Sequence, residues 1–201
     1  KEMMINIINA LKAKSNMSDN SINELFTHST LLKLPKKHIL TSSFQKDRNF
    51  YFMEKGIARS YCVINGKEAT SWFSMEGDIV FSTNNFYGNI KGYEYEIVQL
   101  LENSILYAIP IKELEALYFN NIEIANWSRI LHQDAFIVNE KRLISRLYQT
   151  AEERYTELLE TRPELFQRVN LGYIASYLGI SQVTLSLSLI HISEPTRQAE
   201  I

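Results

Sequence analysis

The sequence has one cysteine, four prolines and no excess of basic residues over its 201 positions. The single thiol, Cys62, cannot form an intramolecular disulfide, and it cannot by itself hold an iron–sulfur cluster or a cysteine-rich metal site. A net charge of −2 argues against a protein that binds nucleic acid through its overall charge. Any DNA-binding function must therefore come from a local motif.

Long apolar runs are also missing. No segment approaches the roughly 18 apolar residues that a membrane span requires, and no signal-peptide core with a cleavage site occurs at the start. We therefore expect a cytoplasmic protein without a membrane partner. With 45% hydrophobic and 22% charged residues the chain is apolar enough to fold. Its length suits a unit of about 120 residues followed by a smaller one.

The first part of the chain has the pattern of a β-rich domain preceded by helices. Short helices are expected at 5–11 and 21–26, and a series of short, often alternating segments begins after Pro35. These segments cover 38–41, 49–53, 57–64, 69–74, 78–82, 94–101 and 104–109. Asn65-Gly66 lies between two of them, and this dipeptide is the strongest short hairpin signal because both turn positions need positive φ. Strands at this spacing predict a barrel or a roll.

One long helix is expected from about residue 122 to residue 148, where neither glycine nor proline occurs. Ile130, Ile137 and Ile144 recur every seven residues, and Trp127 lies on a second apolar flank. We expect these four residues to form a dimer interface with the same helix of a second copy. Burial of the helix within one chain is the alternative that periodicity alone leaves open.

Residues 169–186 have the pattern of a helix-turn-helix. The inner face of the first helix comprises Leu171, Ile174, Ala175 and Leu178. Gly179 can supply the positive φ of a tight turn, and Ser181 can cap a second helix. The inner face of that helix comprises Leu185 with either Val183 or Thr184. Polar side chains at its start would face the major groove or its phosphates. An αα-hairpin in another helical protein would give much of the same pattern.

Up to Ser186 the chain resembles the CRP/FNR family of bacterial transcription regulators. The matching segments are L-P-K at 34–36, F-M-E-K-G-I-A-R at 52–59, N-G-K-E at 65–68, G-D at 77–78 and A-E-E-R-Y at 151–155. The resemblance implies an α+β fold with an N-terminal double-stranded β-roll of the cyclic-nucleotide-binding type. It places the roll and its helices in 1–120, the dimerisation helix in 121–149 and a partial winged helix-turn-helix in 150–186.

The resemblance implies a homodimeric DNA-binding regulator, not an enzyme, that reads an operator of approximate two-fold symmetry. RNA polymerase is a further implied partner. The residues that it assigns to DNA are Ser181, Gln182, Val183, Thr184 and Ser186. The family's pattern also places a basic residue after Ser186, where this chain has Leu187. Residues 187–201 resemble a translated sequencing adapter, so we expect a non-native tail and weak or no DNA binding by the chain as it stands; a genuine divergent tail is the alternative.

Cyclic-nucleotide-binding members of the family hold the phosphate with arginine and serine or threonine, and the ribose with a glutamate. Alignment from the Gly-Asp pair at 77–78 assigns the effector site to Phe81, Ser82, Glu94 and Tyr95. A carboxylate would repel a phosphate in a low-dielectric pocket, so we expect an unknown small-molecule effector other than cAMP or cGMP. Glu94 and Glu96 are expected on a solvated strand face.

No cofactor or metal is expected. The four histidines, His28, His38, His132 and His191, are dispersed, whereas a cupin-type metal site usually has two histidines one residue apart. Neither a glycine-rich phosphate loop nor a G-x-S-x-G motif occurs. Two other functions fit the strand pattern. One is a cupin-like metal enzyme, and the other is a β-roll signalling module whose helical tail binds protein instead of DNA.

Overall fold

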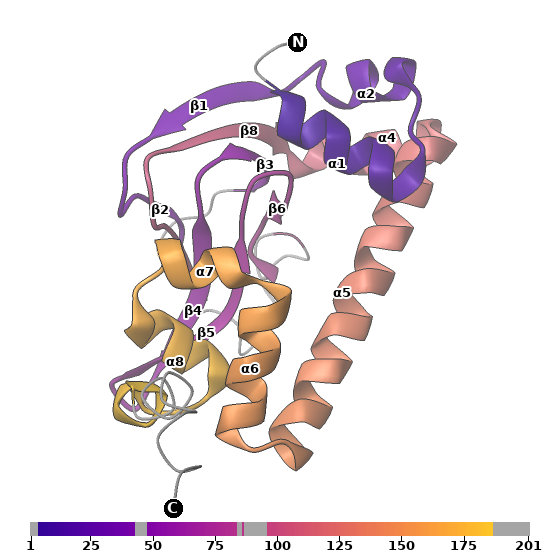
Figure 1. Ribbon diagram of the computed structural model, residues 1–201. Coiled ribbons are helices and arrows are strands. Elements are labelled where there is room, and N and C mark those ends of the chain that lie inside the picture. The colour runs from indigo at the N-terminus through magenta and orange to yellow at the C-terminus, as the bar shows by residue number, and fades with distance from the viewer. Residues whose placement is uncertain (1–3, 43–47, 84–85, 87–95, 187–201) are drawn as a thin grey trace, which may run out of the picture.

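A computed structural model of the chain describes residues 4–42, 48–83, 86 and 96–186 (Figure 1). In the described residues, two helices precede eight strands, and further helices follow. The elements are α1 (Ile5–Ser15), α2 (Asp19–Leu25), β1 (Thr30–Leu34), β2 (Ile39–Thr41), β3 (Asn49–Lys55), β4 (Ala58–Ile64), β5 (Lys67–Ser74), β6 (Ile79–Val80), β7 (Ile97–Leu100), β8 (Ser104–Pro110), α4 (Ile111–Asn120), α5 (Ile122–Tyr148), α6 (Ala151–Thr161), α7 (Pro163–Arg168) and α8 (Leu171–Leu178). Residues 182–186 are also helical. The predicted α+β architecture is confirmed.

The strands form two antiparallel four-stranded sheets, with the orders β1-β8-β3-β6 and β2-β7-β4-β5. We call residues 30–110 the roll. Asn65 and Gly66 connect β4 to β5 with φ values of 51° and 75°, as their hairpin signal predicted. Strand β1 was not predicted from the sequence, and it pairs with β8 from Thr30 opposite Ala108 to Leu34 opposite Ser104.

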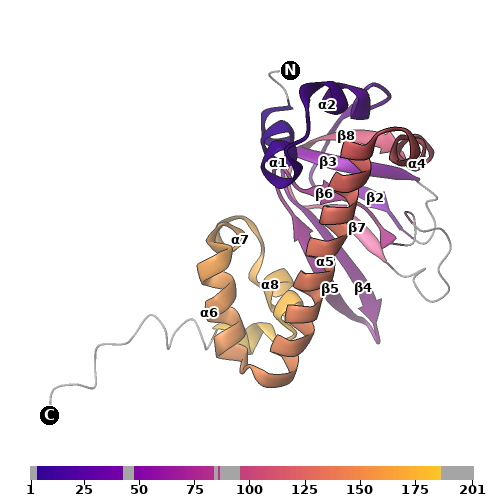
Figure 2. The ribbon, with the colours of Figure 1, turned by 90° about the vertical axis from the view of Figure 1, so that its right-hand side faces the viewer.

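Helix α5 begins against the roll and continues beyond it (Figure 2). Its first turns contribute Ile124 and Trp127 to a core cluster that also contains Phe50 and Phe52. The indole of Trp127 stacks on the ring of Phe52 with a centroid distance of 5.5 Å. At the start of the helix, the Asn121 side chain accepts hydrogen bonds from the amides of Glu123 and Ile124, so the first turn is capped.

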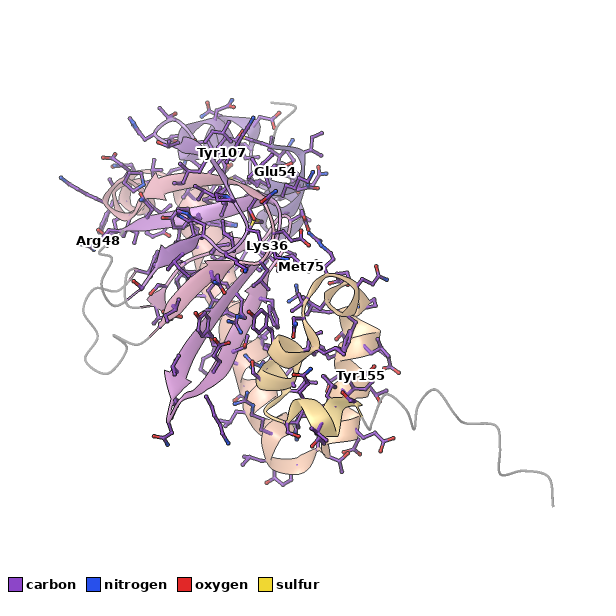
Figure 3. All side chains as sticks on the ribbon, turned by 90° about the vertical axis from the view of Figure 1, so that its left-hand side faces the viewer. Lys36, Arg48, Glu54, Met75, Tyr107 and Tyr155 are labelled. Atoms are coloured by element: carbon purple, nitrogen blue, oxygen red, sulfur yellow. The ribbon has the colours of Figure 1, made fainter. Side chains whose placement is uncertain are left out.

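Helices α6, α7 and α8 pack together and against the roll (Figure 1). We call residues 151–186 the head. One apolar cluster includes Ile57, Phe73, Met75 and Leu101 of the roll together with Tyr155, Leu165, Ile174 and Leu185 of the head. Figure 3 labels one residue from each side of this cluster, Met75 and Tyr155. This one cluster therefore joins the roll to the head.

Candidate nucleic-acid interface and sensor site

The first helix of the predicted helix-turn-helix is α8. Asn170 caps its start, since the side-chain oxygen accepts a hydrogen bond of 2.7 Å from the amide of Gly172. Gly179 ends the helix with a φ of 72°, in the left-handed region that glycine adopts without strain. Within the helix, Ile174 and Ala175 are buried on its inner face. The predicted inner face and turn of α8 are confirmed.

The second helix starts after Ser181. The hydroxyl oxygen of this serine accepts a hydrogen bond of 3.0 Å from the amide of Thr184, which is an N-cap. Leu185 is fully buried and forms the inner face. Val183 and Thr184 are exposed, so neither shares the inner face, where one of the two was expected. The helix-turn-helix is thus anchored by one buried residue in the described part of its second helix.

The residues assigned to DNA lie together at the start of the second helix. Ser181, Gln182, Val183 and Thr184 are exposed, and Ser186 is half-buried with its hydroxyl donating to the carbonyl of Gln182. Two of the hydroxyls are already in contact, because Ser181 and Thr184 lie 2.7 Å apart. This arrangement leaves Gln182 and Val183 as the side chains best placed to reach a partner.

Arginines from other helices hold the end of α8. Arg146 donates to the carbonyl of Tyr177 at 3.1 Å, and Arg154 donates to the carbonyl of Leu178 at 3.2 Å. Arg142 also contacts this end, with its guanidinium 4.1 Å from the centre of the Tyr177 ring. These contacts satisfy carbonyls that lack partners at a helix C-terminus and complement the helix dipole.

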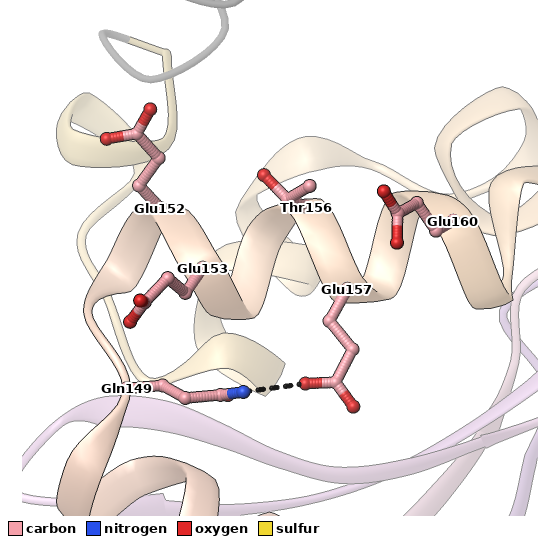
Figure 4. A pocket seen from close by; sticks show the side chains of 6 residues that line it. All are labelled: Gln149, Glu152, Glu153, Thr156, Glu157 and Glu160. Atoms are coloured by element: carbon pink, nitrogen blue, oxygen red, sulfur yellow. Dashed lines mark hydrogen bonds between the residues drawn. The ribbon is translucent and has the colours of Figure 1, made fainter.

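A shallow acidic groove of about 460 Å³ runs along α6 (Figure 4). Its lining residues are Gln149, Glu152, Glu153, Thr156, Glu157 and Glu160. Glu153 belongs to the capping box with Thr150, and Glu157 accepts a hydrogen bond from Gln149. The remaining carboxylates give this face of the head a negative charge that would repel phosphates. A nucleic acid would therefore have to approach the head from another side.

A second cluster of polar groups surrounds Glu96. Its carboxylate accepts hydrogen bonds from Ser60 at 2.8 Å, from Ser82 at 2.7 Å and from the amide of Thr83 at 2.9 Å. Both serines are at most 2% exposed. Glu96 is half-buried, so the expectation that it lies on a solvated strand face was wrong. The Glu96 carboxylate is therefore held by two serine hydroxyls and one backbone amide.

Among the solved structures, regulators share this arrangement over most of their length. FixK2 from Bradyrhizobium japonicum is 18% identical, and the match covers 82% of this chain and 84% of FixK2 with a TM-score of 0.66. A CooA mutant from Carboxydothermus hydrogenoformans is also 18% identical, and the match covers 92% of this chain and 84% of that protein with a TM-score of 0.67. A putative transcriptional regulator of the CRP/FNR family from Eubacterium rectale is 14% identical, and the match covers 92% of this chain and 88% of that protein with a TM-score of 0.66. The chain has the fold of CRP/FNR regulators. No protein-family model and no curated protein matches the sequence.

In this CRP/FNR fold the predicted effector residues are only partly described. Ser82 belongs to the Glu96 cluster, whereas Phe81 stacks on Phe50 at a centroid distance of 5.8 Å and packs against the core. The structure therefore does not place these two side chains in one polar pocket. Glu94 and Tyr95 lie outside the described residues, as do residues 187–201.

The residues expected at a dimer interface separate into two groups. Trp127 is 2% exposed and lies in the core of its own chain, so it is not available to a partner. Ile130 is half-buried, while Ile137 and Ile144 are exposed. Further exposed apolar residues on the second half of α5 are Phe136, Val138, Leu143, Leu147 and Tyr148. Sequence periodicity did not show that the first part of α5 is buried against the roll, whereas the apolar residues of its second half are exposed in the single chain.

The groups that would suit a metal or a reactive thiol are engaged otherwise. Cys62 is half-buried, its thiol contacts the carbonyl of Ala69, and burial raises its pKa. The Nδ1 atom of His132 lies 2.7 Å from the carbonyl oxygen of Ser128. Within the described part of the chain, no three side chains of histidine, cysteine, aspartate or glutamate are grouped so that they could hold a metal ion. No helix of that part is long and apolar enough to cross a membrane.

Proposed function

We propose that the chain is a DNA-binding transcription regulator of the CRP/FNR type that acts as a homodimer and not as an enzyme. The observation that carries this proposal is the capped, exposed start of the second helix at residues 181–184, at the end of a chain that has the fold of known regulators. The solved structures with this fold favour neither a cupin-like enzyme nor a signalling module without DNA binding.

DNA would contact the head at the start of the second helix. Gln182 and Val183 would approach base edges, while Ser181 and Thr184 would lie near the backbone. Ser186 is the fifth residue assigned to DNA. No lysine or arginine occurs from residue 169 to residue 196, so the described head offers few cations for phosphate contacts. We expect the 201-residue chain to bind DNA weakly, and residues 187–201 to differ in the product of the uninterrupted genomic reading frame.

The test of DNA binding uses that uninterrupted product. Selection from random duplexes should enrich a sequence of approximate two-fold symmetry. Gln182→Ala should weaken binding to the selected site by about 1–3 kcal/mol and relax its preference at one position of each half-site. Gln167→Ala is the matched control, because Gln167 is exposed on α7 outside the motif. Equal binding to all duplexes, or equal loss with both variants, would contradict the assignment.

The homodimer would form through the second half of α5. Ile137 and Ile144 lie seven residues apart and are 39% and 51% exposed, in a stretch that carries the further apolar side chains named above. Ile144→Glu should convert the dimer to a monomer in sedimentation, because a carboxylate would be buried against the partner helix. Val63→Glu at the tip of the β4–β5 hairpin changes an equally exposed residue and should leave the dimer intact. A wild-type monomer at micromolar concentration would refute the dimer.

The effector is proposed to be a small molecule other than cAMP or cGMP. The Ser60 and Ser82 hydroxyls, which could bind a phosphate, already donate to the carboxylate of Glu96. A phosphate placed there would meet a negative charge at short range. Calorimetry with cAMP and cGMP should show no heat of binding at micromolar ligand, and a saturable signal would contradict the proposal.

RNA polymerase is proposed as a further partner, testable by transcription in vitro from a promoter that carries the selected site.

A further inference from the structure

Arg59 of β4 lies where the roll meets the head. Its side chain is fully buried, and its guanidinium lies between the rings of Tyr61, 4.0 Å away, and Tyr173, 3.5 Å away. Tyr61 belongs to the same strand, whereas Tyr173 belongs to α8 of the head. One ion pair of 2.8 Å joins Arg59 to Glu68, whose side chain is 43% exposed. The Nε atom is buried and has no hydrogen-bond partner among the described residues.

A buried guanidinium makes this contact easier to open than an apolar one. Removing the charge from water is unfavourable, and the two ring faces and one ion pair offset this cost only in part. Opening the contact would return the charge to water, whereas opening a purely apolar contact would expose only hydrocarbon. Contacts between domains that move are commonly polar in this way. The apolar side chains of the interface hold the head on the roll. The buried charge of Arg59 favours separation of the head, and it does so most when the ring of Tyr173 no longer covers the guanidinium.

The neighbouring residue connects β4 to the Glu96 cluster. Successive side chains of a strand point to opposite faces, so Ser60 points away from the head and donates to Glu96, while Arg59 points toward α8. The pairing of β4 with β5 shifts register beside Ser60, where β5 has one residue more than β4. Such an irregularity mainly bends the strand that carries the extra residue, which here is β5. A change at Glu96 would thus reach the strand one residue from the guanidinium.

We propose that Arg59 is a latch that sets the position of the head on the roll, and that β4 couples this latch to the cluster of Ser60, Ser82 and Glu96. The proposal concerns the position of the head within one chain and does not depend on DNA binding. It assigns a positioning role to Arg59, since the side chain acts on the head through Tyr173.

The test measures the distance between the roll and the head. Spin labels are attached at Lys33→Cys on β1 and Glu160→Cys on α6, both exposed positions, in a Cys62→Ser background. Labelled chains are diluted with unlabelled ones so that distances between subunits do not contribute. Distances are recorded in urea below the unfolding midpoint, where a small population with the head released is amplified. The wild type should give a major distance distribution from docked molecules and a minor one from released molecules.

Arg59→Met retains the volume and removes the charge and its contact with Tyr173. Because the buried charge that favours separation is gone, the ratio of released to docked molecules should fall by at least about 10-fold, while Arg59→Lys, which keeps the cation, should lower it less. Tyr173→Leu alters the same contact from the head and should raise the released fraction, giving a second route if Arg59→Met does not fold. Arg129→Met is the control, since Arg129 is exposed on α5. Unchanged distances in folded Arg59→Met or Tyr173→Leu would overturn the latch.

Glu96→Gln tests the coupling through β4. The amide keeps the volume but loses the charge that accepts from Ser60 and Ser82, so the ratio of released to docked molecules should shift at least about 3-fold. An unchanged ratio of released to docked molecules would overturn the coupling. The coupling would also be overturned if Glu96→Gln changed the urea midpoint of unfolding but left that ratio unchanged.

Discussion

Glu76 provides a quantitative test of the contact between the roll and the head. Its carboxylate lies opposite Arg168 of α7, with two oxygen–nitrogen distances of 2.9 Å and 2.8 Å, and the same guanidinium also binds Glu102. The amide of Gly56 donates to Glu76 as well. The hydrogen bonds from Arg168 are the main reason why the pKa of Glu76 is lowered from 4.5 to about 2. Glu76 should therefore stabilise the folded chain at neutral pH.

The size of this effect follows from the pKa. The difference between a pKa of 4.5 and one of about 2, at roughly 1.4 kcal/mol for each step of one in the pKa, corresponds to an upper bound of about 3.5 kcal/mol. The Glu76 side chain is 25% exposed, so solvent screening reduces the contribution, and we expect about 2 kcal/mol. Because the pKa is lower in the folded state, the contribution is complete above about pH 5 and is lost as the pH falls toward 2.

Glu76→Gln is the variant that tests this reasoning. Its amide oxygen can still accept from Gly56, but the charge opposite Arg168 is gone. Urea unfolding followed by circular dichroism should show a loss of about 2 kcal/mol at pH 7, and the difference from the wild type should shrink to below about half at pH 3. Glu140→Gln, at an exposed position on α5, should change the free energy of unfolding by less than about 0.5 kcal/mol. A loss of equal size at both pH values would refute the electrostatic explanation.

Four further substitutions test the fold. Gly56→Ala should destabilise the chain by about 3 kcal/mol or more in urea unfolding, because a Cβ there would lie 2.2 Å from the Ser104 hydroxyl, whereas Gly66→Ala meets no atom within 4 Å and should cost only about 1 kcal/mol. Trp127→Ala should lower the free energy of unfolding by about 3–5 kcal/mol without dissociating the dimer, since Trp127 is a core residue of one chain. Asn121→Ala should cost about 1–2 kcal/mol in the same assay through loss of the α5 cap. Equal costs at Gly56 and Gly66, or a monomer from Trp127→Ala, would contradict these explanations.

Local signals in the sequence predicted the elements whose geometry is set within a few residues. Asn65-Gly66 forms the turn between β4 and β5, and Gly179 and Ser181 form the turn and the cap of the helix-turn-helix. The bounds of the long helix were also predicted, because no glycine or proline interrupts it and capping residues are local. In contrast, β1 was missed, since T-L-L-K-L lacks strict alternation before Pro35.

Contacts between distant segments decided what the sequence could not show. An arginine in an alternating strand predicts a solvated side chain, yet Arg59 is buried because a tyrosine far along the chain covers it. Glu96 is held by serines from two other segments for the same reason. Trp127 belongs to the apolar side of α5. That this side packs against the same chain, and not against a second copy, depends on where the roll lies relative to the helix. The division between units at residues 120, 149 and 186 stays a prediction.

The geometry of α5 connects the proposed dimer to the position of the head. Arg142 and Arg146 are four residues apart and share one face, from which both contact the end of α8. Ile144 lies between them in sequence and therefore points to the opposite side, where its side chain is exposed. A partner helix packed on Ile144 would thus fix the same turns of α5 that hold α8. In the proposed dimer, the spacing of the two heads is then set by α5 on one side and by the Arg59 contact on the other.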